Sequence, residues 1–152
     1  MNFGIPKKYC SVQYEDYDYF ISLRTSVGKC CFISKANIES AFRIIPIQPK
    51  SYHLLDFSFE GIILINVLPI GCSTSCKPFE QFSCALQCIL QTLFHVTHMS
   101  HILDDYIFLS ESQSLCNFYL QQFFSLARCL SVPVKHSKTV FLSLALLCMV
   151  SR

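Results

Sequence analysis

Two adjacent aspartates, Asp104 and Asp105, lie inside an apolar run, HILDDYIFL, at residues 101–109. Adjacent carboxylates at the tip of a β-hairpin can coordinate a hard divalent cation such as Mg²⁺, which prefers oxygen ligands. Two such ions about 3.5–4 Å apart support in-line phosphoryl or nucleotidyl transfer. The alternative is a plain two-residue turn, in which aspartate is common. The pair by itself leaves both interpretations open.

Composition limits the function classes. The chain has 152 residues, of which 52% are hydrophobic and 14% charged, so one domain with a full core is expected and disorder is not. The net charge of +2 is too small to imply nucleic-acid binding, and the basic surplus within residues 1–50 is typical of a solvated face. The most apolar run, residues 139–150, is shorter than the ~20 residues of a membrane-spanning helix.

The ten cysteines lack the paired CxxC spacing of zinc fingers and ribbons. Cys76, Cys84 and Cys88 spread too widely around a helix to share one metal, so we predict reduced thiols packing as small apolar side chains. Thiols of this kind are typical of an intracellular protein, in the cytoplasm or nucleus.

His95, His98 and His101 are spaced three apart. With no acidic or cysteine ligand next to them in the sequence, they are interpreted as surface or turn residues. Glu80 is interpreted as a first-turn carboxylate at the positive end of a helix dipole.

The elements that must position the aspartates follow from hydrophobic periodicity. Apolar spacings of three and four predict helices over residues 16–27, 79–94 and 116–130. Residues 30–36 read as a strand, and a short helix is expected near residue 42. Alternating apolar arms predict hairpins at 52–59 with 62–69 and at 100–103 with 106–110, the second with Asp104-Asp105 at its tip. This order favours an α+β, two-layer domain with helices on one face of an antiparallel sheet.

Four blocks of the chain occur in one order with suitable spacing. They are KANIESAFRIIPIQPKSYHLL (35–55), EGIILINVLPIGCSTSCKPFEQF (60–82), HILDDYIFL (101–109) and LSVPVKHSKT (130–139). Together they resemble the palm of the reverse transcriptase domain of retroelements, and among these most nearly the DIRS-like, tyrosine-recombinase retrotransposons. The resemblance covers roughly Cys10 to Thr139.

The resemblance implies a right-hand polymerase palm that performs RNA-directed DNA synthesis with two Mg²⁺ ions. Asp104 and Asp105 match the catalytic metal ligands, and Lys138 matches a lysine that assists the leaving pyrophosphate. Phe42 matches the aromatic residue that excludes ribonucleotides, and Gly71 matches a closely approached backbone point beside template and nucleotide. The implied partners are an RNA/DNA primer–template, dNTP and other segments of the retroelement polyprotein, with no membrane.

Position 37 departs from the family pattern. The block that normally opens with a metal-binding aspartate reads KANIESAF, so Asn37 occupies a degenerate catalytic position. An amide oxygen is a weaker Mg²⁺ ligand than a carboxylate, and this ligand normally bridges both ions. The substitution therefore predicts a weakened second metal and impaired catalysis.

We expect residues 1–140 to be a fingers and palm fragment and residues 141–152 to be a divergent or truncated tail, without a thumb. The first hypothesis is an inactive reverse transcriptase fragment. The second is an active polymerase completed by another polypeptide. The third is a non-catalytic module that uses a palm-like sheet to bind nucleic acid or another partner.

Overall fold

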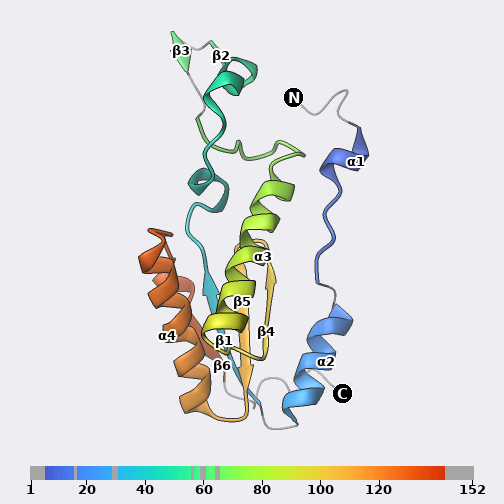
Figure 1. Cartoon of the computed structure of the whole chain (residues 1–152), viewed down its shortest axis with the longest axis vertical. Helices are drawn as coiled ribbons and strands as arrows, with labels where there is room; N and C mark the ends of the chain where they lie inside the picture. The colour runs from blue at the N-terminus through green and yellow to red at the C-terminus, as the bar shows by residue number, and fades with distance from the viewer. Residues whose placement is uncertain are drawn as a thin grey trace.

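The computed structural model describes residues 6–15, 17–28, 31–55, 57–58, 61–63 and 66–142 (Figure 1). Its α-helices are α1 (Lys7–Cys10), α2 (Tyr17–Val27), α3 (Cys76–Leu93) and α4 (Gln113–Cys129). Its strands are β1 (Phe32–Asn37), β2 (Phe57–Ser58), β3 (Ile62–Ile63), β4 (Met99–Ile102), β5 (Asp105–Ser110) and β6 (Val140–Leu142). Short 3-10 helices are η1 (Ala41–Ile44), η2 (Pro49–Leu54) and η3 (His136–Lys138).

The main sheet has four strands in the order β4-β5-β1-β6, and every neighbouring pair is antiparallel. Because side chains alternate along a strand, each strand contributes to both faces. Tyr106 and Phe108 of β5 belong to the core beneath α3 and α4, whereas Leu109 belongs to a second cluster on the other face. The α+β architecture predicted from the sequence is confirmed.

Helices α3 and α4 lie side by side over one face of the sheet and enclose the main core (Figure 1). Phe79 of α3 and Phe123 of α4 are buried against this face, and the rings of Tyr106 and Phe123 have centroids 4.8 Å apart. Each fully buried side chain of this size stabilises the fold by about 1.5–3 kcal/mol relative to exposure. This core fixes the position of the β4–β5 hairpin.

Helix α2 packs on the opposite face, which the sequence interpretation had left uncovered. Its Val27 lies in a small cluster with Ile33 of β1 and Leu109 of β5. Helix α2 therefore lies beside the end of the sheet far from the β4–β5 turn (Figure 1).

The three long helices, the strand at residues 30–36 and the β4–β5 hairpin match their predictions within a few residues. The short helix expected near residue 42 is η1, which follows β1. The strand predicted over 52–59 is wrong in part, because η2 includes residues 52–54. Residues 45–47 and 66–68 form an isolated antiparallel β-bridge. In it the N–H of Ile47 donates to the Asn66 carbonyl and the N–H of Leu68 donates to the Ile45 carbonyl. The predicted Glu60 turn position lies outside the described residues.

Three further features concern the described part of the chain. Within the described ranges, no helix is both long and apolar enough to cross a membrane. The eight cysteines in the described part of the chain are free, and the predicted packing as small apolar side chains fits the buried Cys31, Cys72 and Cys116 but not the exposed Cys84, Cys88 and Cys129. Strand β6 extends the sheet through Leu142, across the predicted boundary at residue 140, and that division of the chain stays a prediction.

Candidate catalytic site

The register of the sheet brings Asn37 to the paired aspartates. Asn37 is the last residue of β1 and lies directly opposite Asp105, the first residue of β5. The next residue, Ile38, donates its backbone N–H to the carbonyl of Asp104 at 2.9 Å. Asn37 thus meets two aspartates that follow it by 67 and 68 positions in the sequence, at one end of two neighbouring strands.

The Asn37 side chain bridges both carboxylates. Its Nδ2 donates to Asp104 Oδ2 at 2.8 Å and to Asp105 Oδ1 at 2.6 Å. Ionised carboxylates only accept hydrogen bonds, so the amide must turn its NH₂ group, and not its oxygen, toward them. Asn37 is buried, with 4% of its surface exposed, so these bonds satisfy a donor that water cannot reach. The amide thus supplies the positive end of a dipole between two like charges.

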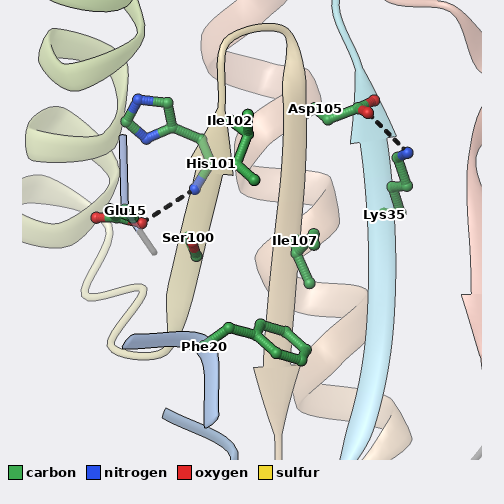
Figure 2. A pocket seen from close by; sticks show the side chains of 8 residues that line it. All are labelled: Glu15, Phe20, Lys35, Ser100, His101, Ile102, Asp105 and Ile107. Carbon is green, nitrogen blue, oxygen red and sulfur yellow. Dashed lines mark hydrogen bonds and ion pairs between the residues drawn. The ribbon is translucent and has the colours of Figure 1, made fainter. Parts of the chain in front are cut away.

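A lysine provides a second positive group. Lys35 Nζ lies 2.9 Å from Asp105 Oδ2, one strand away across the β1–β5 ladder (Figure 2). Both side chains are more than a third exposed, so this ion pair is worth no more than about 1 kcal/mol. Lys35 and Asp105 also line a pocket of about 350 Å³ whose other walls are mostly apolar.

The turn of the β4–β5 hairpin differs from its prediction by one residue. Ile102 pairs with Asp105, so the tip is Leu103-Asp104 and not Asp104-Asp105. Leu103 takes a left-handed φ of 53° and is partly buried against the main core. Asp105 is therefore held by the sheet, while Asp104 is held by the turn.

The other predicted site residues lie on separate segments. Phe42 lies in η1 and packs its ring 5.3 Å from that of Phe79. Gly71 has a φ of +84°, which favours glycine. A Cβ there would meet no protein atom within 4 Å, so the space beside this backbone position is not filled by the protein. Lys138 is exposed at the end of η3, and its ammonium makes no ion pair within the described part of the chain.

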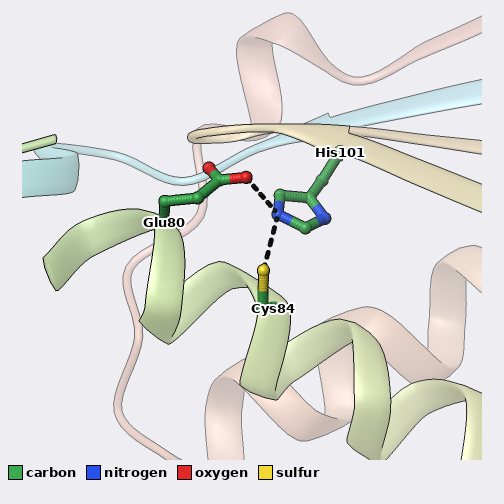
Figure 3. A group of neighbouring side chains, drawn as sticks. All are labelled: Glu80, Cys84 and His101. Carbon is green, nitrogen blue, oxygen red and sulfur yellow. Dashed lines mark hydrogen bonds and ion pairs between the residues drawn. The ribbon is translucent and has the colours of Figure 1, made fainter. Parts of the chain in front are cut away.

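A second polar cluster lies inside the domain, and sequence reasoning missed it. His101 is 2% exposed, and its Nε2 lies 3.3 Å from Glu80 Oε1 and 3.9 Å from Cys84 Sγ (Figure 3). The interpretation of His101 as a surface or turn residue is therefore wrong, and acidic and cysteine groups do lie beside it. Glu80 is likewise buried, in the face of α3 that packs on the sheet. Burial raises the pKa of the Cys84 thiol, and the nearby Glu80 carboxylate adds to the effect.

A signal for this cluster existed in the sequence. Glu80, Ser83 and Gln87 recur at spacings of three and four within the apolar face of α3, so the helical period places polar groups in the core. A buried polar group needs a partner. The sequence does not say which residue supplies it, because His101 reaches this helix only through the packing of β4.

The known proteins that this chain resembles are found among solved structures. Neither a protein-family model nor a curated protein matches the chain. A foamy viral protease-reverse transcriptase in complex with double-stranded DNA matches with a TM-score of 0.70 and 21% identity, over 87% of this chain and 22% of that chain. The same type of protein in complex with an RNA/DNA hybrid matches with a TM-score of 0.62 and 23% identity, over 74% of this chain and 15% of that one.

A third match is the prototype foamy virus protease-reverse transcriptase, with a TM-score of 0.65 and 17% identity, over 86% of this chain. The chain spans between 15% and 22% of the length of these three proteins. At this level of identity the likeness concerns the fold. The β1–β5–β4 sheet with α3 and α4 packed on it thus has a reverse transcriptase-like fold.

Proposed function

We propose that this chain is a palm segment of a retroelement reverse transcriptase whose polymerase activity is impaired at position 37. The observation that carries the proposal is the pair of hydrogen bonds from Asn37 Nδ2 to Asp104 and Asp105. The four sequence blocks and the reverse transcriptase-like fold support the class of protein. The blocks also support a DIRS-like origin, and the reduced thiols expected from the sequence support an intracellular location.

The proposed reaction is nucleotidyl transfer, in which bound Mg²⁺ stabilises charge on the attacking and leaving oxygens. Asp104 and Asp105 supply carboxylate oxygens for one ion. Asn37 does not fit the bridging role, because its N–H groups point at the carboxylates and a donor group repels a cation. Turning the amide over would present its oxygen but would break both hydrogen bonds.

The roles of the remaining site residues belong to the same proposal. Phe42 would lie against the sugar of an incoming nucleotide, Gly71 would admit template or nucleotide close to its backbone, and Lys138 would neutralise pyrophosphate. The solved neighbours that carry an RNA/DNA hybrid or double-stranded DNA support a primer–template as the partner. The rest of the polymerase would come from other segments of the retroelement polyprotein.

The test restores the carboxylate with Asn37→Asp. Mn²⁺, which reports a Mg²⁺ site by electron paramagnetic resonance, is titrated into the wild-type chain and the variant, and primer extension is measured on an RNA template. We expect Mn²⁺ affinity and any extension to rise at least about tenfold, the equivalent of about 1.4 kcal/mol. Asn66→Asp, on an exposed loop residue, adds the same charge elsewhere and should change neither.

The metal titration keeps the test decisive even where this segment alone holds primer–template too weakly to extend it. Equal Mn²⁺ affinity in the wild type, Asn37→Asp and Asn66→Asp would remove the basis of the proposal.

A second candidate function is a non-catalytic module on the same sheet. The observation that favours it is that Asn37 and Lys35 already compensate the aspartates without a metal. Such a module would bind an RNA/DNA hybrid at moderate salt with an affinity that Mg²⁺ and Asn37→Asp leave unchanged. A filter-binding titration with and without Mg²⁺ separates it from the impaired polymerase.

A further inference from the structure

We propose that Glu80, Cys84 and His101 form a zinc site that ties helix α3 to strand β4. Glu80 and Cys84 are four residues apart on one face of α3, and His101 points at them from the neighbouring strand (Figure 3). All three candidate ligand atoms lie within 4.8 Å of one another. The site is separate from the Asp104-Asp105 pair and does not depend on the proposed function.

The hydrogen bonds around His101 leave Nε2 as its ligand atom. Gln87 Nε2 donates to Glu15 Oε1 at 2.9 Å, and this contact orients the Gln87 amide because a carboxylate only accepts. Gln87 Oε1 is then left to accept from Nδ1–H of His101. In the neutral ring the Nε2 lone pair consequently faces Glu80 Oε1 and Cys84 Sγ. Metal-bound histidines in proteins usually have their second nitrogen held in this way.

The buried carboxylate of Glu80 points to a cation. Glu80 is 6% exposed, and its Oε2 is buried and has no hydrogen-bond partner among the described residues. A lone pair on His101 facing a carboxylate is repulsive unless a proton or a metal lies between them. No lysine or arginine forms an ion pair with Glu80 in the described part of the chain. A cation at the point shared by the three side chains satisfies both Glu80 and His101.

The donor set and its spacing suit zinc. Tetrahedral Zn²⁺ places nitrogen and oxygen ligands about 3.4 Å apart and nitrogen and sulfur ligands about 3.6 Å apart. The observed separations from His101 Nε2 are 3.3 Å to Glu80 Oε1 and 3.9 Å to Cys84 Sγ. A thiolate, an imidazole and a carboxylate together favour Zn²⁺ over Mg²⁺ or Ca²⁺, which take oxygen ligands.

The site also has an entry path and room for a fourth ligand. Cys84 is exposed, so its thiol can rotate toward the ion and release its proton to solvent as the metal binds. Cys84, Glu80 and His101 line an open pocket of about 160 Å³ together with Glu15 and Gln87. A water molecule from this pocket can complete the coordination. Three protein ligands from α3 and β4 would then hold the hairpin that carries Asp104 and Asp105.

The experiment uses the full chain, reduced and freed of metal with a chelator. Zn²⁺ is titrated by calorimetry, and Co²⁺ is used as a spectroscopic substitute because tetrahedral Co²⁺ with a thiolate ligand gives a sulfur-to-cobalt absorption band. We expect one equivalent of Zn²⁺ with a Kd of about 1 μM or below, a cobalt–thiolate band, and a higher melting temperature with Zn²⁺.

The variant Cys84→Ser changes an exposed side chain and should keep the fold, which circular dichroism checks. It is expected to remove the cobalt–thiolate band, to weaken Zn²⁺ binding at least about 100-fold and to abolish the melting shift. The matched control is Cys88→Ser, which removes an exposed thiol from the next turn of α3, beside the same pocket. It should leave all three readouts as in the wild type.

Glu80→Gln keeps the shape of the side chain and removes its charge, so it should weaken Zn²⁺ binding by about tenfold or more. The proposal is overturned if the wild type shows no cobalt–thiolate band, if the band survives Cys84→Ser, or if Cys88→Ser lowers it equally.

Discussion

At the residue scale, one nitrogen atom decides how the paired aspartates are stabilised. Asn37 Nδ2 makes two charge-assisted hydrogen bonds in a partly buried place, and such bonds contribute about 1.5–3 kcal/mol each. The carboxylates thereby stay together without a metal ion. The same contact removes the oxygen ligand that a bridging cation would need.

Replacing this amide by a carboxylate should make stability depend on metal. In a chelator, Asn37→Asp loses both hydrogen bonds and adds a third negative charge, so we expect it to lower the free energy of unfolding by about 2–4 kcal/mol. Mg²⁺ that binds the folded variant should recover about 2.7 kcal/mol at 100 times its Kd. Urea denaturation with and without Mg²⁺ measures both effects. An Asn37→Asp variant as stable as the wild type in chelator would contradict the structure at this point.

At the element scale, helices α3 and α4 are each followed by a residue in the left-handed region. His95 follows α3 with a φ of 54°, and Ser131 follows α4 with a φ of 56°. At the end of α4 the N–H of Val132 bonds the carbonyl of Ala127, and the N–H of Ser131 bonds that of Arg128. These two bonds form a Schellman motif, in which glycine is usually found at the position of Ser131.

The variant Ser131→Gly should therefore stabilise the protein. Glycine takes a positive φ without the steric cost that serine has, so we expect a gain of about 0.5–1 kcal/mol in the free energy of unfolding. The matched control is Ser125→Gly on the exposed face of α4, where the same change lowers helix propensity and should cost about 0.5 kcal/mol. Chemical denaturation of both variants measures the two effects, and equal signs would contradict the assigned cap.

At the scale of the whole molecule, global unfolding exposes ionisable groups that the core keeps neutral. Cys116 of α4 is buried against the sheet, with its Sγ 3.2 Å from Ser34 Oγ and 3.7 Å from the Phe108 carbonyl. Burial raises the pKa of this thiol above its ordinary value of 9.0. Burial also raises the pKa of the Tyr106 hydroxyl. Stability should therefore depend on pH on the alkaline side.

The sign follows from the proton balance. Below pH 9 the thiol is protonated in both states, and above it the unfolded chain loses a proton that folded Cys116 keeps, so stability falls as pH rises. We expect Cys116→Ala to reduce the steepness of this fall by up to about 1.4 kcal/mol per pH unit. Cys129→Ala, an exposed thiol on the same helix, should leave the steepness unchanged. Denaturation under reducing conditions between pH 8 and pH 11 checks this, and identical slopes in both variants would contradict it.

Most helices and strands were predictable from the sequence, because the signals that form them are local. The apolar spacing of residues 79–94 predicted α3, and the alternating arms around Asp104-Asp105 predicted the β4–β5 hairpin with its tip one residue out of place. The order of four short blocks also led to the palm fold, which the solved structures support. The 3-10 helix over residues 49–54 was missed, because its last three residues begin the run YHLLDFSF at 52–59, which matches a strand equally well.

Which side chains meet, and which atoms they present to one another, follows from the packing of the domain. The β1–β5 register put Asn37 across from Asp105, and the acceptor-only carboxylates then turned its NH₂ group inward. Packing of β4 on α3 likewise buried His101 against Glu80 and Cys84. Periodicity reports which face of an element is buried but not which distant element covers it. Contacts between residues far apart in the chain depend on the packing of the whole domain, so they had to come from the fold.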